Sequence, residues 1–179
     1  MNLLGLDIGG TKTAVCLADE KGKIRHSQRF PSTADSQDDY FNRLRSACDE
    51  TLAACRLSRT DVTAVGISAP GPLDVKRGVL IAPPNNPGWH DVPFVANVQA
   101  WFKAPVHLQH DGKASVLAEW HFGAFQGAAN LIYLTFSTGM GAGLILNGEL
   151  LQGATDSAGE VGHQILDPRG PGCAGGMKG

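Results

Sequence analysis

The stretch that decides the fold is Asp7-Ile8-Gly9-Gly10-Thr11-Lys12, close to the start of a chain of 179 residues. It places an acid at the end of an apolar run, followed by two glycines, a hydroxyl and a lysine. Glycines allow backbone N–H groups to converge on a phosphate, and Thr11 and Lys12 add hydroxyl and ammonium donors. Asp7 is placed to hold Mg²⁺ through its water. The stretch matches neither the dinucleotide fingerprint nor the P-loop pattern, so an ordinary hairpin turn remains the alternative.

A second glycine-rich stretch, Ser137-Thr138-Gly139-Met140-Gly141, repeats this chemistry. It lies between two apolar runs, residues 131–136 and 142–146, as the first stretch lies between residues 3–8 and 13–18. Two such turns in two similar halves favour one nucleotide clamped between them over two ordinary hairpins. The residues expected to contact the nucleotide are Asp7, Gly9, Gly10, Thr11, Lys12, Thr138, Gly139 and Gly141.

Hydrophobic periodicity and turn residues predict the other elements. Ser36 and Asp39 resemble an acidic capping box, and the helix that follows places Cys48 and Cys55 on its apolar face as core residues. The predicted strands cover residues 3–8, 13–18, 24–30, 61–68, 106–108, 131–136 and 142–146, and further helices cover residues 92–102 and 113–122. This order predicts an α/β fold with helices packed on mixed sheets. We expect a first domain over residues 1–110 and a second over residues 111–179.

The composition argues against several classes of protein. Hydrophobic residues make up 42% and charged residues 18% of the chain, which suffices for a core and argues against disorder. With 15 Lys and Arg against 17 Asp and Glu, the net charge of −2 argues against a nucleic-acid partner. No run approaches the roughly 18 apolar residues of a membrane span, and the start lacks a signal-peptide pattern. We therefore expect a protein of the reducing cytoplasm, with free thiols and no membrane partner.

Three motifs together resemble the ROK family of bacterial sugar kinases and sugar-responsive repressors. They are the first glycine stretch, the second glycine stretch, and Ala158-Gly159-Glu160-Val161-Gly162-His163, in the family's order. The segments 66–72 and 84–89 also fit the family's pattern. The resemblance spans residues 3–179 and implies the actin-like ATPase (ribonuclease H-like) fold, with the second domain incomplete. It also implies a transferase of carbohydrate metabolism, a kinase that uses ATP with Mg²⁺.

The resemblance assigns the catalytic base to Asp111. This residue follows the apolar run 106–108 and opens a predicted helix, where a helix cap would be its role on sequence grounds alone. The family places its catalytic aspartate in a segment of the form Asn-Asp-x-Asn, and a carboxylate there would accept the proton of the sugar hydroxyl. This chain reads His110-Asp111-Gly112-Lys113, so His110 replaces the family's sugar-binding asparagine and Lys113 replaces the second asparagine.

The resemblance also assigns sugar contacts to Glu160 and His163, which would share one face if their segment is helical. Asn85 is expected in the substrate-side loop, with Asn86 as a weaker candidate and a simple turn as the alternative. Trp89 and Trp120 are expected to pack in the core or beneath that loop rather than to stack on a sugar.

The family's structural zinc site is matched only in part. His163 and Cys173 have the spacing of its first two ligands, but the third position is Gly175 and the fourth would be residue 180. Structural zinc is held by four ligands, usually thiolates and imidazoles. An unpaired Cys173 thiol is therefore favoured over a zinc ligand.

The sequence thus predicts an ATP-dependent kinase that phosphorylates a hydroxyl of a glucose-like hexose, with N-acetylmannosamine or another hexose as the next substrates. The expected partners are the sugar and ATP, and the resemblance implies a homodimer. The competing hypothesis is a catalytically incompetent sugar-binding fragment or a regulatory relative, which His110, Lys113 and Gly175 favour. The family's repressors carry a DNA-binding helix-turn-helix before the first glycine turn, and this turn begins at residue 7, so we expect no DNA binding.

Overall fold

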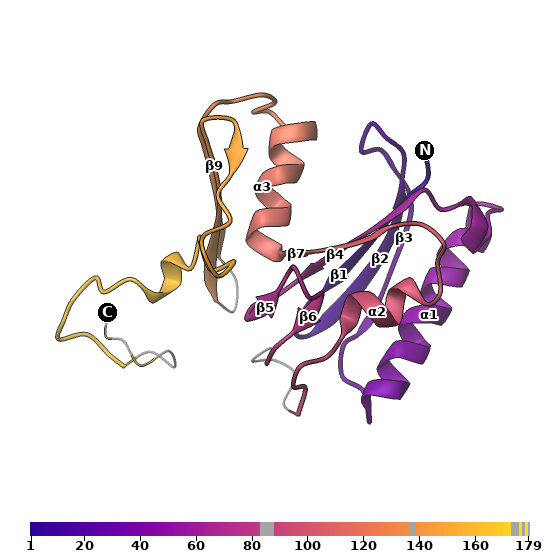
Figure 1. Ribbon diagram of the computed structural model, residues 1–179, viewed down its shortest axis with the longest axis horizontal. Helices are drawn as coiled ribbons and strands as arrows, with labels where there is room; N and C mark the ends of the chain where they lie inside the picture. Colours follow the sequence, from indigo (N-terminus) through magenta and orange to yellow (C-terminus); the bar gives the residue numbers. More distant parts are fainter. Residues whose placement is uncertain (83–87, 137–138, 173–175, 177, 179) are drawn as a thin grey trace. The chain divides into compact units, whose positions relative to one another are not determined.

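A five-stranded mixed sheet organises the first of two units, Met1–Asp111 and Gly112–Gly179, in the computed structural model (Figure 1). The structure describes residues 1–82, 88–136, 139–172, 176 and 178. The strand order of the sheet is β3-β2-β1-β4-β7, in which β1, β2 and β3 are antiparallel and β4 and β7 run parallel to β1. The strands are β1 (Leu3–Ile8), β2 (Lys12–Ala18), β3 (Ile24–Pro31), β4 (Ala64–Ala69) and β7 (Val106–His110).

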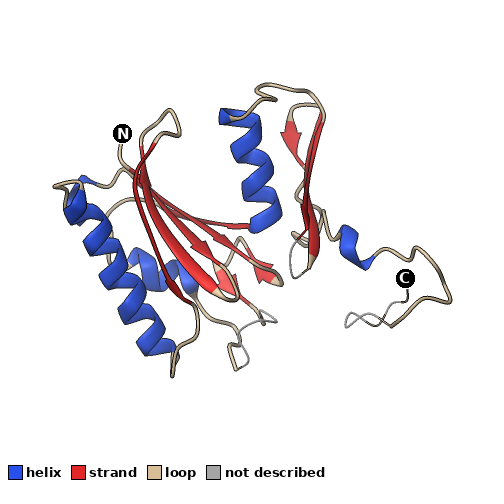
Figure 2. Cartoon of the chain, turned by 180° about the vertical axis from the view of Figure 1, so that it is seen from behind, coloured by secondary structure: helices blue, strands red, loops and turns tan. Residues whose placement is uncertain are grey.

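Two helices of the first unit, α1 (Gln37–Ala54) and α2 (Phe94–Gln99), lie on the same face of this sheet (Figures 1 and 2). The Ser36 side chain accepts a hydrogen bond from the Asp39 backbone N–H, which confirms the predicted cap of α1. Alternate residues of β1 and the apolar face of α1 are buried in one core, because side chains alternate across a strand and recur every three to four residues in a helix. Cys48 is fully buried as predicted, and Cys55 packs half-buried at the edge of the core.

An aromatic cluster joins α1 to α2. The ring of Tyr40 lies edge-on to Trp89, with the ring centroids 4.8 Å apart, and the ring of Phe41 lies 4.9 Å from that of Phe94. Trp89 is therefore a core residue, as expected. The remaining short elements of the first unit are η1 (Arg59–Asp61), β5 (Leu73–Asp74) and β6 (Val79–Leu80).

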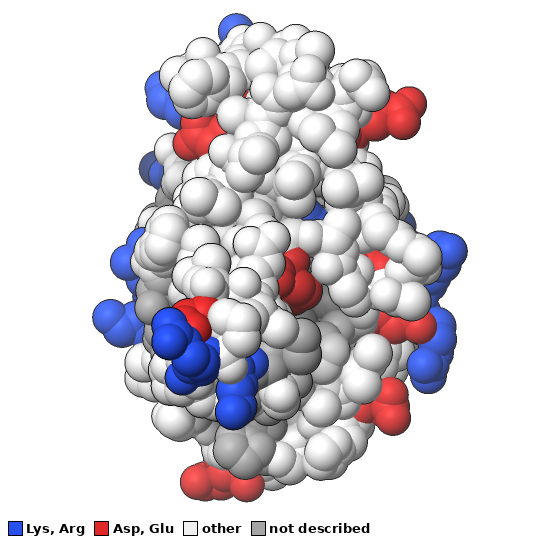
Figure 3. Space-filling model, turned by 90° about the vertical axis from the view of Figure 1, so that its left-hand side faces the viewer, with Lys and Arg blue, Asp and Glu red and all other residues white. Residues whose placement is uncertain are grey.

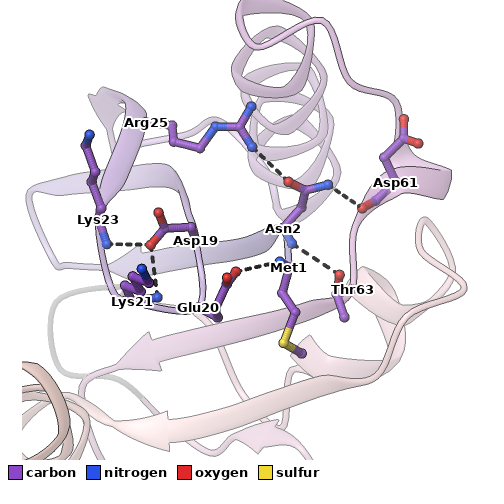
Figure 4. A network of polar contacts seen from close by, with 9 residues as sticks. All are labelled: Met1, Asn2, Asp19, Glu20, Lys21, Lys23, Arg25, Asp61 and Thr63. Carbon is purple, nitrogen blue, oxygen red and sulfur yellow. Dashed lines mark hydrogen bonds and ion pairs between the residues drawn. The ribbon is translucent and has the colours of Figure 1, made fainter.

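The amino-terminal ends of the sheet strands are tied together by exposed polar contacts (Figure 4). The Met1 ammonium group lies 2.5 Å from the Glu20 carboxylate, in the turn between β2 and β3. The Asn2 side chain donates to the carbonyl of Asp61 and accepts from Arg25, with N–O distances of 3.0 and 2.8 Å. These contacts hold the end of the sheet that is opposite to the glycine turn after β1.

The second unit contains an antiparallel sheet of order β10-β9-β8, a helix that begins at the unit boundary, and a short 3₁₀ turn. Gly112 and Gly143 allow the helix to approach the sheet, because a Cβ atom at Gly143 would lie 2.1 Å from the Gly112 carbonyl oxygen. Asn147 and Gly148 have φ values of 53° and 78° and form the hairpin turn between β9 and β10. The elements are α3 (Asp111–Phe122), β8 (Leu131–Phe136), β9 (Met140–Leu146), β10 (Glu149–Leu150) and η2 (Val161–His163).

One face of β8 carries exposed apolar side chains. Ile132, Leu134 and Phe136 alternate along the strand and are 61%, 46% and 73% exposed. Trp120 on α3 is half-buried instead, and its indole N–H donates to the Ala128 carbonyl at 2.9 Å. Among the described residues, no helix is both long and apolar enough to cross a bilayer.

Several predicted boundaries are wrong, among them the end of the strand predicted over residues 106–108, which extends to His110, and the start of the helix predicted over residues 113–122, which begins at Asp111. The strand predicted over residues 61–68 begins at Ala64, because residues 59–61 form a 3₁₀ turn. The helix predicted over residues 92–102 begins only at Phe94, since Val92 pairs as extended chain with Leu80. The predicted turn over residues 137–141 ends earlier, because β9 begins at Met140.

Candidate functional site

Three parallel strands of the first unit end in a row of polar side chains. The register of β1 and β4 pairs Asp7 with Ser68, and the register of β4 and β7 pairs Ser68 with Gln109. Asp111 follows directly after β7 as the first residue of α3. In open α/β sheets, ligands bind at the carboxyl ends of the parallel strands. The two predicted acidic residues, Asp7 and Asp111, therefore belong to the edge of the sheet at which a ligand site is expected.

Two carboxylates, those of Asp7 and Asp111, interact at this edge of the sheet. The surrounding protein displaces water from the Asp7 carboxylate and raises its pKa, and a hydrogen bond with the Ser68 side chain opposes that change. The negative charge of Asp111 raises the pKa of Asp7 further, whereas Arg29 lowers it. Two carboxylates that repel each other favour a cation between or near them.

Asp111 is held by the residue before it. The Nδ1 atom of His110 lies 3.1 Å from Oδ1 of Asp111, and the His110 backbone N–H donates to the Gln109 side chain at 2.8 Å. The His110 side chain is only 13% exposed, whereas that of Asp111 is 47% exposed. The acid is thus accessible to a substrate hydroxyl, and the imidazole that replaces the expected asparagine contacts the acid directly.

The glycine turn after β1 is closed by backbone hydrogen bonds. The Gly9 N–H donates to the Lys12 carbonyl at 3.1 Å, and a Cβ atom at Gly9 would lie 2.7 Å from that same oxygen. Thr11 and Lys12 are exposed. A side chain at position 9 would open the turn, which explains the glycine, and the exposed hydroxyl and ammonium groups remain accessible to an anion.

A buried chain of hydroxyl groups connects this turn to the helix α1. The Ser32 hydroxyl donates to the Gly9 carbonyl at 2.5 Å, and its oxygen lies 2.9 Å from the Thr13 hydroxyl. The Thr13 hydroxyl lies 2.7 Å from that of Tyr40 on α1. Thr13, Ser32 and Tyr40 are all buried. The turn is therefore connected to the core of the first unit through hydrogen bonds that water does not reach.

The predicted second glycine turn is described only in part. Gly139 is exposed and has open space where a side chain would be, and Gly141 lies within β9 opposite Thr135. Thr138, which we predicted to contact the nucleotide, lies outside the described residues, as does Asn85 of the predicted substrate-side loop.

Glu160 and His163 lie together in the second unit. Glu160 is the residue before η2 and His163 ends it, and the Nε2 atom of His163 lies 3.8 Å from Oε2 of Glu160. Both side chains are exposed, so a carboxylate and an imidazole are available to hydroxyl groups of a ligand. Gly159 and Gly162 pack against carbonyl groups of β9, which holds this segment on the sheet.

The predicted zinc site is described only in part, through His163. In the part of the chain that the structure describes, no group of three or more potential metal ligands occurs. Cys173 lies outside that part, and the sequence has a glycine at position 175. Mg²⁺ is a different case, because it keeps several waters and is usually bound through one or two carboxylates and the phosphates of its substrate. The oxygen donors of Asp7 and Asp111 fit that role.

Sequence reasoning missed two features of the site. Ser68 was part of a segment that fits the ROK pattern, and its position at the end of a parallel strand was the signal for its place beside Asp7. Lys113 differs from the family's asparagine in the sequence, but nothing in the sequence shows that it is buried in the second unit at 1% exposure.

The surface charges are spread over the molecule. On the face seen in Figure 3, basic and acidic side chains are interspersed between broad uncharged areas.

Comparison with known proteins finds relatives along the whole chain. Residues 3–179 match the model of the ROK family. Glucokinase of Thermotoga maritima is 33% identical over 180 residues, which is 100% of this chain and 55% of that protein. The xylose repressor of Bacillus subtilis is 28% identical over 98% of this chain and 45% of that protein. The chain therefore spans about half the length of the curated relatives it matches.

Solved structures show the same relationship. A ROK hexokinase from Thermus thermophilus superposes with a TM-score of 0.85 at 36% identity, over 100% of this chain and 58% of that one. A glucokinase from Streptomyces griseus, crystallised with glucose and AMPPNP, superposes with a TM-score of 0.84 at 33% identity, over 100% and 55%. The fold is thus the mixed α/β actin-like ATPase fold, of which this chain covers about half.

Proposed function

The chain belongs to the ROK family, and on that premise we propose that it is the part of an ATP-dependent sugar kinase that carries the catalytic base and the first phosphate turn. The observation that carries the proposal is the row of Asp7, Ser68 and Gln109 at the carboxyl ends of β1, β4 and β7, with Asp111 directly after it. The preferred acceptor is a glucose-like hexose, and the preferred location is the cytoplasm. The two units then correspond to the two subdomains of the kinase.

In this proposal Asp111 accepts the proton of the attacking sugar hydroxyl. A general base contributes typically 10²–10⁴-fold to the rate, and it must be ionised and accessible to the hydroxyl. Asp111 is half-exposed, and the contact with His110 Nδ1 fixes the orientation of its carboxylate. The same imidazole takes the place of the asparagine that would bind the sugar, so His110 is proposed to contact both the base and the substrate.

In this proposal the glycine turn after β1 binds the phosphates, and Asp7 binds the magnesium ion that accompanies them. Backbone N–H groups, the Thr11 hydroxyl and the Lys12 ammonium group supply donors to the phosphate oxygens. Asp7 would hold Mg²⁺ through its water, and the ion would supply positive charge to the transferred phosphoryl group. Glu160 and His163 would orient the sugar hydroxyls. The roles of Thr138 and Asn85 remain predictions from the sequence.

A coupled assay of ADP release over a panel of hexoses tests the proposal. We expect sugar-dependent release with the wild-type chain and a decrease of at least about 100-fold in Asp111→Asn, because the amide cannot accept the proton. The kinase activity would be disproved if circular dichroism shows that the chain is folded and none of the sugars increases the release of ADP.

A regulatory sugar-binding relative is the second candidate, and the contact between His110 and Asp111 is the observation that favours it. A base that is engaged by an imidazole is a weaker proton acceptor than one that faces only solvent. Isothermal titration with the same hexoses distinguishes the two, because the regulatory reading predicts sugar binding without ADP release.

A further inference from the structure

A buried lysine in the second unit is unexplained by the roles described above. The Lys113 side chain is 1% exposed, and it lies in the first turn of α3, two residues after Asp111. Its ammonium group donates to the carbonyls of Gln152 and Asp156, at 2.8 and 2.7 Å, and lies 3.4 Å from the side-chain oxygen of Gln152. An ammonium group has three N–H donors, so these three oxygens can satisfy it completely.

Burial of a charged group is unfavourable unless it is hydrogen-bonded and its charge is compensated. Loss of water lowers the pKa of Lys113, while the negative charges of Asp156 and Glu160 raise it. Glu160, which is proposed to bind the sugar, therefore interacts with the Lys113 ammonium group, and the same group holds residues 152–156 through hydrogen bonds.

The segment between β10 and η2 depends on such an anchor. Gly153, Asp156 and Gly159 all have positive φ, and Asp156 adopts this conformation with a side chain, at φ 57°. Residues in such conformations persist only where surrounding contacts hold them. The Gln152 carbonyl that accepts from Lys113 also accepts from the Ala158 N–H at 3.2 Å. One carbonyl group therefore joins the two ends of the loop to each other and to α3.

We propose that Lys113 is a positioning residue, whose ammonium group fixes the segment 152–163 on α3 and thereby presents Glu160 and His163 to the sugar. The second half of this statement rests on the proposed function. The first half concerns only the second unit and is independent of any ligand.

Hydrogen exchange measured residue by residue tests the anchor. In Lys113→Met we expect the amides of Ala158 and Val161, which donate to Gln152 and Gly159, to exchange at least ten times faster than in the wild type. Amides of α1 in the first unit should stay within a factor of two. Lys103→Met removes an exposed lysine and is the matched control, in which both sets of amides should stay within a factor of two.

Exchange of the segment within a factor of two of the wild type in Lys113→Met would overturn the proposal. If that variant loses protection throughout the chain, Lys113→Gln decides, because glutamine is polar but one atom shorter than lysine and carries no charge, so it cannot replace the bonds to both carbonyls. Faster exchange confined to the segment in Lys113→Gln supports the anchor, and unchanged exchange refutes it.

Glucose titration tests the consequence for the sugar. We expect Lys113→Gln to weaken glucose binding at least five-fold, and unchanged affinity beside a rapidly exchanging segment would refute the positioning role. If the wild-type chain binds no hexose at all, the proposed function fails, while the exchange experiment still decides whether Lys113 is the anchor.

Discussion

Replacement of Thr13 by valine is the sharpest test of how the first phosphate turn is supported. Valine has nearly the shape of threonine but lacks the hydroxyl. That hydroxyl lies within hydrogen-bond distance of Ser32 and Tyr40, and all three side chains are buried. In Thr13→Val, Ser32 keeps its bond to the Gly9 carbonyl, but the Tyr40 hydroxyl loses the partner that it has in the core.

The magnitude follows from these two contacts. Each hydrogen bond contributes about 1 kcal/mol net, and a buried hydroxyl left without a partner costs a further ~1–2 kcal/mol. Two lost bonds and one unpartnered hydroxyl together should lower the free energy of unfolding by about 3–4 kcal/mol in Thr13→Val. Tyr40→Phe leaves Thr13 with Ser32 and should cost only about 1 kcal/mol. The double variant should cost about 2–3 kcal/mol less than the sum of the two, because the Thr13–Tyr40 bond is counted only once and no Tyr40 hydroxyl is left without a partner.

Urea denaturation, monitored by the fluorescence of Trp89 beside Tyr40, measures these differences. With a slope of about 2 kcal/mol per molar urea, the midpoint should decrease by roughly 1.5–2 M in Thr13→Val. Thr63→Val is the matched control, because the Thr63 hydroxyl is exposed and accepts one bond from the Asn2 N–H. If Thr13→Val is no less stable than Thr63→Val, the hydroxyl chain does not support the turn.

Three further predictions concern single residues. Because folding raises the pKa of Asp7, the ionised carboxylate opposes folding at neutral pH. Asp7→Asn should therefore have a higher urea midpoint than the wild type at pH 7, and the difference should disappear as the pH falls below the pKa of the carboxylate in the unfolded chain. The same difference between variant and wild type at pH 7 and at pH 3 would contradict this. Burial raises the pKa of the Cys48 thiol to about 12, so iodoacetamide should modify Cys48 at least ten times more slowly than the half-buried Cys55, as mass spectrometry of the native protein would show; equal rates would refute it. Gly143→Ala should destabilise the contact of α3 with β9 by about 1–3 kcal/mol, measured by hydrogen exchange of α3, whereas Gly66→Ala, where a Cβ atom meets open space, should leave that exchange unchanged.

The sequence was sufficient to predict most of the local structure. Short apolar runs bounded by turn residues located β1, β2 and β8, and the Ser36 cap located the start of α1, because these signals lie within a few residues of one another. It also singled out Asp7 and Asp111. Boundaries failed where a tertiary contact decided the conformation, as at Val92, whose pairing with Leu80 keeps it extended.

The details of the site depended on pairing between distant parts of the chain. Asp7 and Ser68 are neighbours only through the register of β1 with β4, and no local pattern specifies that register. Lys113 could not be recognised as a core residue, because lysine is almost never fully buried unless its charge is paired, and its partners are backbone carbonyls about forty residues further along. Thr13 likewise looked like an ordinary strand residue until Tyr40 and Ser32 were seen beside it.

The exposed face of β8 has a practical consequence for work with this chain. A strand that presents Ile132, Leu134 and Phe136 to solvent, at the edge of its sheet in the described part of the chain, can pair with the same strand of another molecule. Concentrated solutions should therefore become turbid on storage, and recombinant yields should be limited by precipitation rather than by synthesis. A lysine in place of Ile132 would act as a gatekeeper that keeps the strands of different molecules apart.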